Sequence, residues 1–314
     1  MDGLNNIILS VLPPFLLLGL GAFARKVGWF RAEADASISM ITIRVLYPCF
    51  ILFHILGAQN IVIDFRSFLT PLYGFFSILI GFILSWAVSH IFKMERDTAK
   101  SFRFSSGIFN YGFIAITVGE ALLGTEIVVR IILFNLGVEV AIWTIGIVVL
   151  TSNKFCISGM LNPPSVAVLI ALFVQVLGGK ELLPSFVWEV VMQVGRCSIP
   201  IGLILIGGSC YVLMEGFKFS KGLKIEGASI LVRNFLFPSF VIAFLYLFPL
   251  PGGMEWMKSV LVTQAAMPAG IFAIVIVGNY KGDKQTAMRS ILVTMIASIV
   301  TLPVWLMIGV RLFN

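Results

Sequence analysis

The chain has 314 residues, of which 59% are apolar and only 12% are charged, with a formal net charge of +7. Soluble chains are about 45–50% apolar and about 25% charged, so this composition excludes a water-soluble globular domain. Because one helix needs roughly 20 apolar residues to cross a bilayer, the length allows about ten spans with short loops, and excludes a large catalytic domain or a nucleic-acid-binding module. The partner that the composition implies is the lipid bilayer.

Long apolar runs, bounded by charged or turn-forming residues, predict ten membrane-spanning helices. Membrane barrel strands would be about ten residues long with alternating polarity, whereas these runs are longer and uniformly apolar. The predicted segments span residues 7–24, 37–56, 68–92, 104–123, 127–150, 163–178, 186–214, 228–248, 257–277 and 290–313. We therefore expect an all-α polytopic membrane protein. Gly202, Gly207 and Gly208 give the seventh segment a small-residue face, which is typical of close helix packing.

The basic residues indicate the orientation of these segments. Fourteen Lys and Arg residues fall in the connections after odd-numbered segments, and five fall on the opposite side, namely Arg66, Arg130, Lys180, Lys258 and Arg311. Basic loops are retained in the cytoplasm. The bias predicts a multi-pass protein of the cell (inner or plasma) membrane with both termini outside the cytoplasm, and it accounts for most of the net charge.

Scarce residues recur in the same order in the two halves of the chain, which indicates an internal repeat. The matched positions are Pro13 with Pro163, Arg44 with Arg196, Pro48 with Pro200, Arg66 with Arg233, Gly112 with Gly270 and Arg130 with Arg289. Each half holds five predicted segments, an odd number, so the second half enters the membrane from the opposite face. We predict inverted repeats over 1–151 and 163–314, joined by a short cytoplasmic linker over 152–162. Inverted repeats are typical of secondary transporters, which bind substrate near the midplane between the repeats.

The fourth and ninth segments are interrupted at matching depths by helix-breaking and polar residues. The interruptions contain Asn110, Tyr111 and Gly112 in the first half, and Gln264, Pro268 and Gly270 in the second. Each segment can open there into two half-helices, whose freed amides and positive ends would bind an anion, especially a carboxylate. We expect these six residues to bind substrate. The alternative is a pair of kinks that neighbouring helices satisfy.

Glu139 lies midway along the fifth segment, with Asn135 four residues earlier on the same face. Placing an ionisable side chain at that depth of the bilayer costs free energy, so its presence there indicates a proton or cation pathway. We expect these two residues to carry a coupling proton or sodium ion. The alternative is a structural role, with Glu139 paired to Arg44, Arg196 or a freed amide.

Four arginines lie in or beside the predicted spans, and two of them have two possible roles. Arg44 and Arg196 each lie one turn before a proline and either attract an anion or bond carbonyls and snorkel to the interface. Arg66 and Arg233 begin the third and eighth segments, and we expect them to be interface anchors.

Motifs for other chemistry are missing from the sequence. The four cysteines and two histidines show no metal-ligand spacing, and no phosphate-binding GxxxxGK[ST] loop occurs. We expect no enzyme activity, no bound metal and no cofactor other than a coupling Na⁺ or H⁺.

Several short stretches together resemble the auxin efflux carrier family, which includes bacterial malate-permease-like proteins. They are Arg25-Lys26, Tyr47-Pro48, Asn110-Tyr111-Gly112, Asn162-Pro163-Pro164, Ile199-Pro200 and Ala266-Met267-Pro268. The resemblance implies a fold related to bile-acid/sodium symporters, with a scaffold part of segments 1, 2, 6 and 7 and a transport part of segments 3–5 and 8–10. It also implies substrate binding where segments 4 and 9 cross, at Asn110 and Pro268, and a homodimer formed through the scaffold part.

The predicted function is therefore secondary active transport of a small organic anion, such as a malate-like carboxylate or an auxin-like acid, by an elevator-like movement. The plant carriers have a long hydrophilic loop between the halves, and the short linker here favours the malate-like class. A sodium/proton antiporter and a bile-acid-type sodium symporter are alternative transporters. A membrane sensor or receptor is the alternative outside transport, and would require an attached signalling domain or partner chain.

Overall fold

The computed structural model describes residues 2–58, 66–152 and 162–313. Within these ranges the chain is helical and contains no strand beyond one isolated β-bridge. The predicted linker at 152–162 lies outside the described residues except at its two ends. The all-α prediction is confirmed for the described chain.

Sixteen α-helices make up most of the described chain. They are α1 (Asp2–Lys26), α2 (Asp35–Ile41), α3 (Tyr47–Gly57), α4 (Thr70–Ile91), α5 (Arg96–Gly107), α6 (Phe113–Leu123), α7 (Glu126–Ala141), α8 (Ile147–Thr151), α9 (Pro163–Leu177), α10 (Ser185–Arg196), α11 (Ser198–Glu215), α12 (Lys224–Ile230), α13 (Phe237–Leu247), α14 (Trp256–Ala265), α15 (Phe272–Asn279) and α16 (Lys284–Phe313). Short 3₁₀ turns are η1 (Ala32–Ala34), η3 (Ser67–Leu69), η6 (Gly179–Leu182) and η7 (Lys221–Leu223). Three π-helical turns join helices end to end: η2 (Thr42–Leu46), η4 (Ile142–Gly146) and η8 (Leu231–Leu236).

Seven continuous helical stretches in the described residues are long and apolar enough to cross a membrane. They lie on the first, second, third, fifth, seventh, eighth and tenth predicted segments. The sixth segment forms the shorter helix α9, and the fourth and ninth segments are each divided into two helices, α5 with α6 and α14 with α15. Every predicted segment is therefore helical, but three of them are not single long spans.

Several helices begin earlier than predicted. Helix α5 starts at Arg96 rather than near residue 104, and α16 starts at Lys284 rather than near residue 290. The eighth segment likewise extends back to Lys221. Charged residues that marked these boundaries lie inside the helices, where a long side chain can reach a polar partner. Arg103, for example, is the eighth residue of α5, and its Nε donates to Ser89 Oγ at 2.7 Å.

Two of the π-helical turns are followed, after one further residue, by a proline. Pro238 follows η8 and Pro48 follows η2, and proline supplies no N–H to the carbonyl four residues earlier. For Pro238 that carbonyl belongs to Asn234, and it accepts instead from Trp305 Nε1 of α16 at 2.7 Å. The wider turn thus places a freed backbone group where a neighbouring helix satisfies it.

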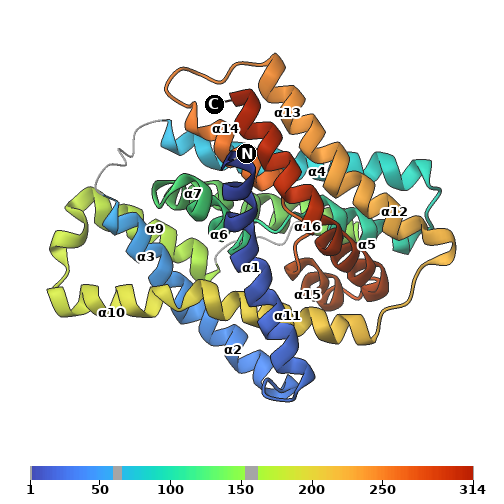
Figure 1. Ribbon diagram of the computed structural model, residues 1–314, viewed down its shortest axis with the longest axis horizontal. Helices are drawn as coiled ribbons and strands as arrows, with labels where there is room; N and C mark the ends of the chain where they lie inside the picture. The colour runs from blue at the N-terminus through green and yellow to red at the C-terminus, as the bar shows by residue number, and fades with distance from the viewer. Residues whose placement is uncertain (1, 59–65, 153–161, 314) are drawn as a thin grey trace.

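Many of the helices fall into two groups, and helices within each group pack on one another (Figure 1). Helices α9 and α10 pack on α3 on the left of the view, while α5, α12 and α16 lie on the right and α4 runs across the upper part of the view. Helices α1 and α11 cross between the groups and pack on each other. Helix α7 lies along α4.

Glycines allow the closest of these approaches. A Cβ atom at Gly21 of α1 would lie 2.0 Å from the Ile204 carbonyl oxygen of α11, and one at Gly207 would lie 2.0 Å from that of Leu18. A Cβ at Gly137 of α7 would lie 1.6 Å from the Pro71 oxygen of α4. The small-residue face predicted on the seventh segment is therefore confirmed at Gly207, where two backbones meet.

We predict that Gly21→Ala lowers the thermal stability of the purified protein in detergent. The added methyl group forces α1 away from α11, and such overpacking costs about 1–3 kcal/mol. Gly19→Ala is the matched control, because nothing lies within 4 Å of its Cβ position and alanine is favoured over glycine in a helix by about 0.5–1 kcal/mol. Equal melting temperatures for the two variants would contradict the close contact.

Candidate functional site

Two divided helices meet at the centre of the molecule. Helix α5 ends at Gly107 and α6 begins at Phe113, while α14 ends at Ala265 and α15 begins at Phe272. The unwound residues between them run antiparallel, with Phe109 opposite Ala269. The Asn110 N–H donates to the Pro268 oxygen at 2.8 Å, and the Gly270 N–H donates to the Ile108 oxygen at 2.9 Å. The interruptions lie where the sequence predicts them, and they pair with each other.

A neighbouring helix and a glycine support this pairing. The Ala269 N–H donates to Thr294 Oγ1 of α16 at 3.1 Å. A Cβ atom at Gly270 would lie 2.9 Å from the Phe109 oxygen, so a side chain there would push the two stretches apart. Gly112 has open space at its Cβ position. The close approach therefore requires the glycine of the second interruption but not that of the first.

Side-chain amides surround the carbonyl group of Tyr111. Asn135 Nδ2 donates to this oxygen at 2.9 Å, and Gln264 Nε2 lies 3.5 Å from it and 3.3 Å from Asn135 Oδ1. The structure thus brings Asn135, predicted as a coupling residue, together with Tyr111 and Gln264, predicted as substrate-binding residues. The buried Asn110 Nδ2 and Gln264 Oε1 have no hydrogen-bond partner among the described residues. One free donor and one free acceptor therefore remain at the crossing.

Glu139 of α7 connects the crossing to the start of helix α9. Its carboxylate accepts from Tyr111 Oη at 2.6 Å, from Trp143 Nε1 at 3.0 Å and from Asn162 Nδ2 at 2.9 Å. Asn162 also caps α9, because its Oδ1 accepts from the Ser165 N–H at 2.9 Å. The partners of Glu139 in this structure are three neutral donors from α7, the crossing and the start of α9, and no arginine pairs with it among the described residues.

Arg44 and Arg196 lie away from the crossing. Both side chains are exposed, and the Arg196 guanidinium lies 5.7 Å from the centre of the Phe53 ring. The described part of the chain gives neither residue a hydrogen bond or ion pair with Asn110, Asn135 or Gln264. The structure therefore does not join them to the other predicted residues.

Arg233 is the charged residue that sequence reasoning placed wrongly. Its side chain is 0% exposed, so it is not an interface anchor. The guanidinium lies 4.0 Å from the centre of the Phe237 ring and 5.2 Å from that of Phe109, which is part of the crossing. The error follows from the boundary of the eighth segment: because the helical stretch begins at Lys221, Arg233 lies twelve residues inside it rather than at its start.

The environment of Arg233 leaves its hydrogen-bonding groups unsatisfied. None of its three guanidinium nitrogens has a partner among the described residues. An aromatic face stabilises a desolvated cation by about 2 kcal/mol, whereas moving such an ion out of water costs several kcal/mol even after relaxation. The two rings therefore offset only part of the cost of burying this charge.

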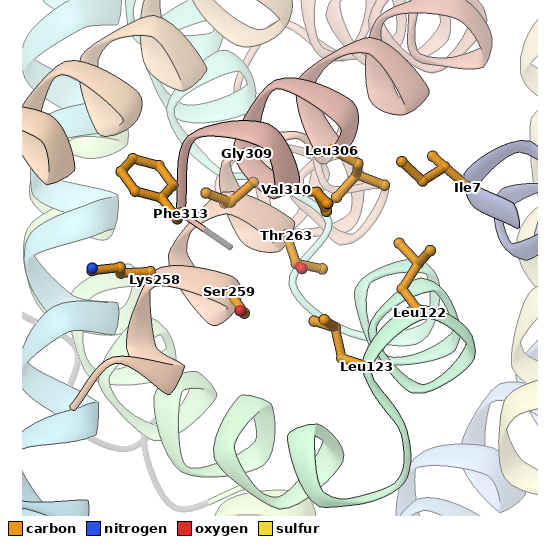
Figure 2. A pocket seen from close by; sticks show the side chains of 11 residues that line it. Ile7, Leu122, Leu123, Lys258, Ser259, Thr263, Leu306, Gly309, Val310 and Phe313 are labelled. Carbon is orange, nitrogen blue, oxygen red and sulfur yellow. The ribbon is translucent and has the colours of Figure 1, made fainter. Parts of the chain in front are cut away.

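Two cavities lie beside the half-helices. The larger, of about 730 Å³, lies between α3, α10, α6 and α7 and has His54, Thr117, Glu120, Glu126, Lys180 and Arg196 in its wall. The smaller, of about 230 Å³, is mainly apolar, and Ser259 and Thr263 of α14 supply hydroxyl groups to it (Figure 2). Lys258 and Phe313 close one side of this cavity and Ile7 the other. The crossing residues Asn110 and Tyr111 line neither cavity.

Comparison with known proteins identifies the family. The sequence profile described as "Membrane transport protein" matches residues 6–155 and 147–306. An uncharacterized transporter of Methanothermobacter thermautotrophicus is 22% identical over 315 aligned positions, which cover 96% of this chain and 97% of that protein. The chain belongs to the membrane transport protein family, the family of the auxin efflux carriers to which its sequence motifs point.

Proposed function

We propose that the protein is a secondary active transporter of a small organic anion, built from two inverted repeats of five spans each. The observation that carries the proposal is the mutual pairing of two interrupted helices, through Asn110 with Pro268 and Gly270 with Ile108. Irregular backbone at membrane depth is tolerated only where protein buries it or where it lines a pathway. Broken helices from the two halves of a transporter chain typically form its substrate site.

The chemistry of the crossing favours an anion. Helices α6 and α15 both begin there, so the positive ends of two half-helices lie beside the same point. The free Asn110 Nδ2 adds a neutral donor, and the free Gln264 Oε1 adds an acceptor for a hydroxyl group. A hydroxylated carboxylate of the malate class uses both, and we propose this class as the substrate.

The larger cavity supports movement between two groups of helices. It separates α3 and α10 from α6 and α7, and its wall includes Gly57, Thr125 and Lys180, which lie near the connections after the second, fourth and sixth segments. The positive-inside bias puts these connections outside the cytoplasm. We propose that this cavity is the outer access path, and that α4–α8 with α12–α16 move against α1–α3 with α9–α11.

We predict that purified protein in liposomes accumulates labelled malate or another acid of a C4 to C6 carboxylate panel, and that Asn110→Ala impairs it. The substitution removes the free donor, and a hydrogen bond to a charged group contributes about 1.5–3 kcal/mol, so substrate affinity should fall by about tenfold or more. The measurement is the substrate concentration for half-maximal uptake. Asn279→Ala is the control, because Asn279 is exposed at the end of α15.

Two results would contradict this proposal. Absence of uptake for every acid of the panel argues against a carboxylate transporter. Unchanged affinity in Asn110→Ala argues that the crossing is not the substrate site.

We also propose that Glu139 couples protonation to the movement. A carboxylate can accept from Tyr111, Trp143 and Asn162 at once, but a protonated carboxyl group has one oxygen that donates. Protonation therefore weakens at least one of the three bonds. Because Asn162 starts α9, on the opposite side of the proposed moving boundary, the charge of Glu139 controls a contact between the two groups of helices.

We predict that Glu139→Gln abolishes the pH dependence of transport and slows uptake by about tenfold or more, since the amide keeps the shape of the side chain but cannot exchange a proton. Initial uptake rates across a pH series, with and without sodium, provide the measurement. Glu189→Gln on the exposed face of α10 serves as the control. Should Glu139→Gln retain the wild-type pH and sodium profiles, coupling through this residue is excluded.

A further inference from the structure

Arg233 is an enclosed positive charge in the middle of a long apolar helix. It lies on the π-helical turn η8 between α12 and α13, and its side chain is completely buried. The Phe237 and Phe109 rings flank the guanidinium, and these two rings also contact each other with their centres 5.8 Å apart. The charge is therefore covered by aromatic carbon rather than by acceptors.

The described chain supplies no counter-charge for Arg233. Its Nε and both Nη atoms lack a hydrogen-bond partner, and no Asp or Glu among the described residues forms an ion pair with it. Glu139 bonds the crossing residue Tyr111, and its carboxylate already accepts hydrogen bonds from three donors. Buried charges in proteins are normally paired, so the missing partner of this guanidinium is expected to come from outside the described residues, and a bound ligand can supply it.

The location of Arg233 links it to the crossing. Phe109, which covers the guanidinium, is adjacent to Asn110, whose Nδ2 is also buried and also lacks a partner. Phe109 belongs to the unwound stretch and pairs with Ala269. A rearrangement of the crossing that moves Phe109 would therefore uncover one side of the guanidinium.

We propose that Arg233 supplies the counter-charge for a carboxylate group of the substrate, and so restricts the transported molecules to anions. A guanidinium presents a planar pair of donors that matches the two oxygens of a carboxylate, while Asn110 Nδ2 donates to a further oxygen of the same molecule. This assignment rests on the proposed function, because it identifies how the crossing recognises its substrate. It distinguishes Arg233 from Arg44 and Arg196, whose exposed side chains can find their counter-ions in water or lipid headgroups.

The experiment compares wild-type protein with Arg233→Met, Arg233→Lys and Arg66→Met. Arg66 is the repeat-related arginine, and its side chain is exposed. For each purified protein in detergent, the melting temperature is measured alone, with malate and other acids of the carboxylate panel, and with malamide, the neutral diamide of malate. A ligand that binds the folded state raises its melting temperature.

Arg233→Met is expected to melt at a higher temperature than wild type without ligand, because an apolar side chain of similar length replaces an uncompensated buried charge. It should also lose the shift caused by the acid, with affinity reduced by about 10- to 100-fold. Arg233→Lys should retain part of the shift, and Arg66→Met all of it. Malamide should shift none of the proteins.

Other outcomes separate the possible failures. An Arg233→Met protein that keeps the wild-type acid affinity overturns the assignment of Arg233. Lower stability with retained acid response shows instead that the arginine has only a structural role between the two rings. If Arg233→Met does not fold, acid affinity equal to wild type in the folded Arg233→Lys protein overturns the assignment. If no acid of the panel shifts wild-type protein, the proposed function itself fails, and the assignment fails with it.

Discussion

The structure depends on one requirement, which is that backbone groups without helical partners must be satisfied inside a membrane-spanning fold. Two helices are broken, and each break satisfies the other: Asn110 donates to Pro268, and Gly270 donates to Ile108. Neither interruption could stay open alone without leaving buried N–H and carbonyl groups unpaired. Hydrogen bonds therefore join the two halves of the chain at the two places where their helices are interrupted.

This arrangement determines which polar groups are left for a ligand. Thr294 is used to hold Ala269, and Asn135 is used to hold the Tyr111 carbonyl. Among the described residues, the groups without partners at or next to the crossing include the Asn110 amide, the Gln264 oxygen, the Asn234 side-chain oxygen and the Arg233 guanidinium. Because the surrounding side chains are mostly apolar, these few groups dominate what the crossing can recognise. The residues that hold the crossing together are therefore different from those that we propose bind the substrate.

The sequence was sufficient for the interruptions but not for Arg233. Pro268, Gly270 and Gly112 are helix-breaking residues at matching depths. They act on their own backbone, so they predict an interruption without any knowledge of the packing around them. The position of Arg233 depends instead on where a helix begins, because the charged residues Lys221, Lys224 and Glu226 predict a loop before residue 228. Charged side chains in the first turns of a membrane helix can reach polar partners, as Glu226 does at Ser220. Hydropathy alone does not resolve such a boundary, and burial of Arg233 follows only from packing against Phe109 and Phe237.

Glu139 and Arg233 carry opposite charges but lie in opposite situations. Three neutral donors satisfy Glu139, so it can be ionised in the empty protein without an external partner. Arg233 has no acceptor among the described residues, so within them only the two aromatic rings offset the cost of its charge. A carboxylate bound beside Arg233 would offset the cost of the charge that the described residues leave unpaired. We therefore propose different roles for the two charges beside this unwound stretch. Arg233, which Phe109 covers, pairs with the charge of the substrate, and Glu139, which accepts from Tyr111, carries the coupling proton.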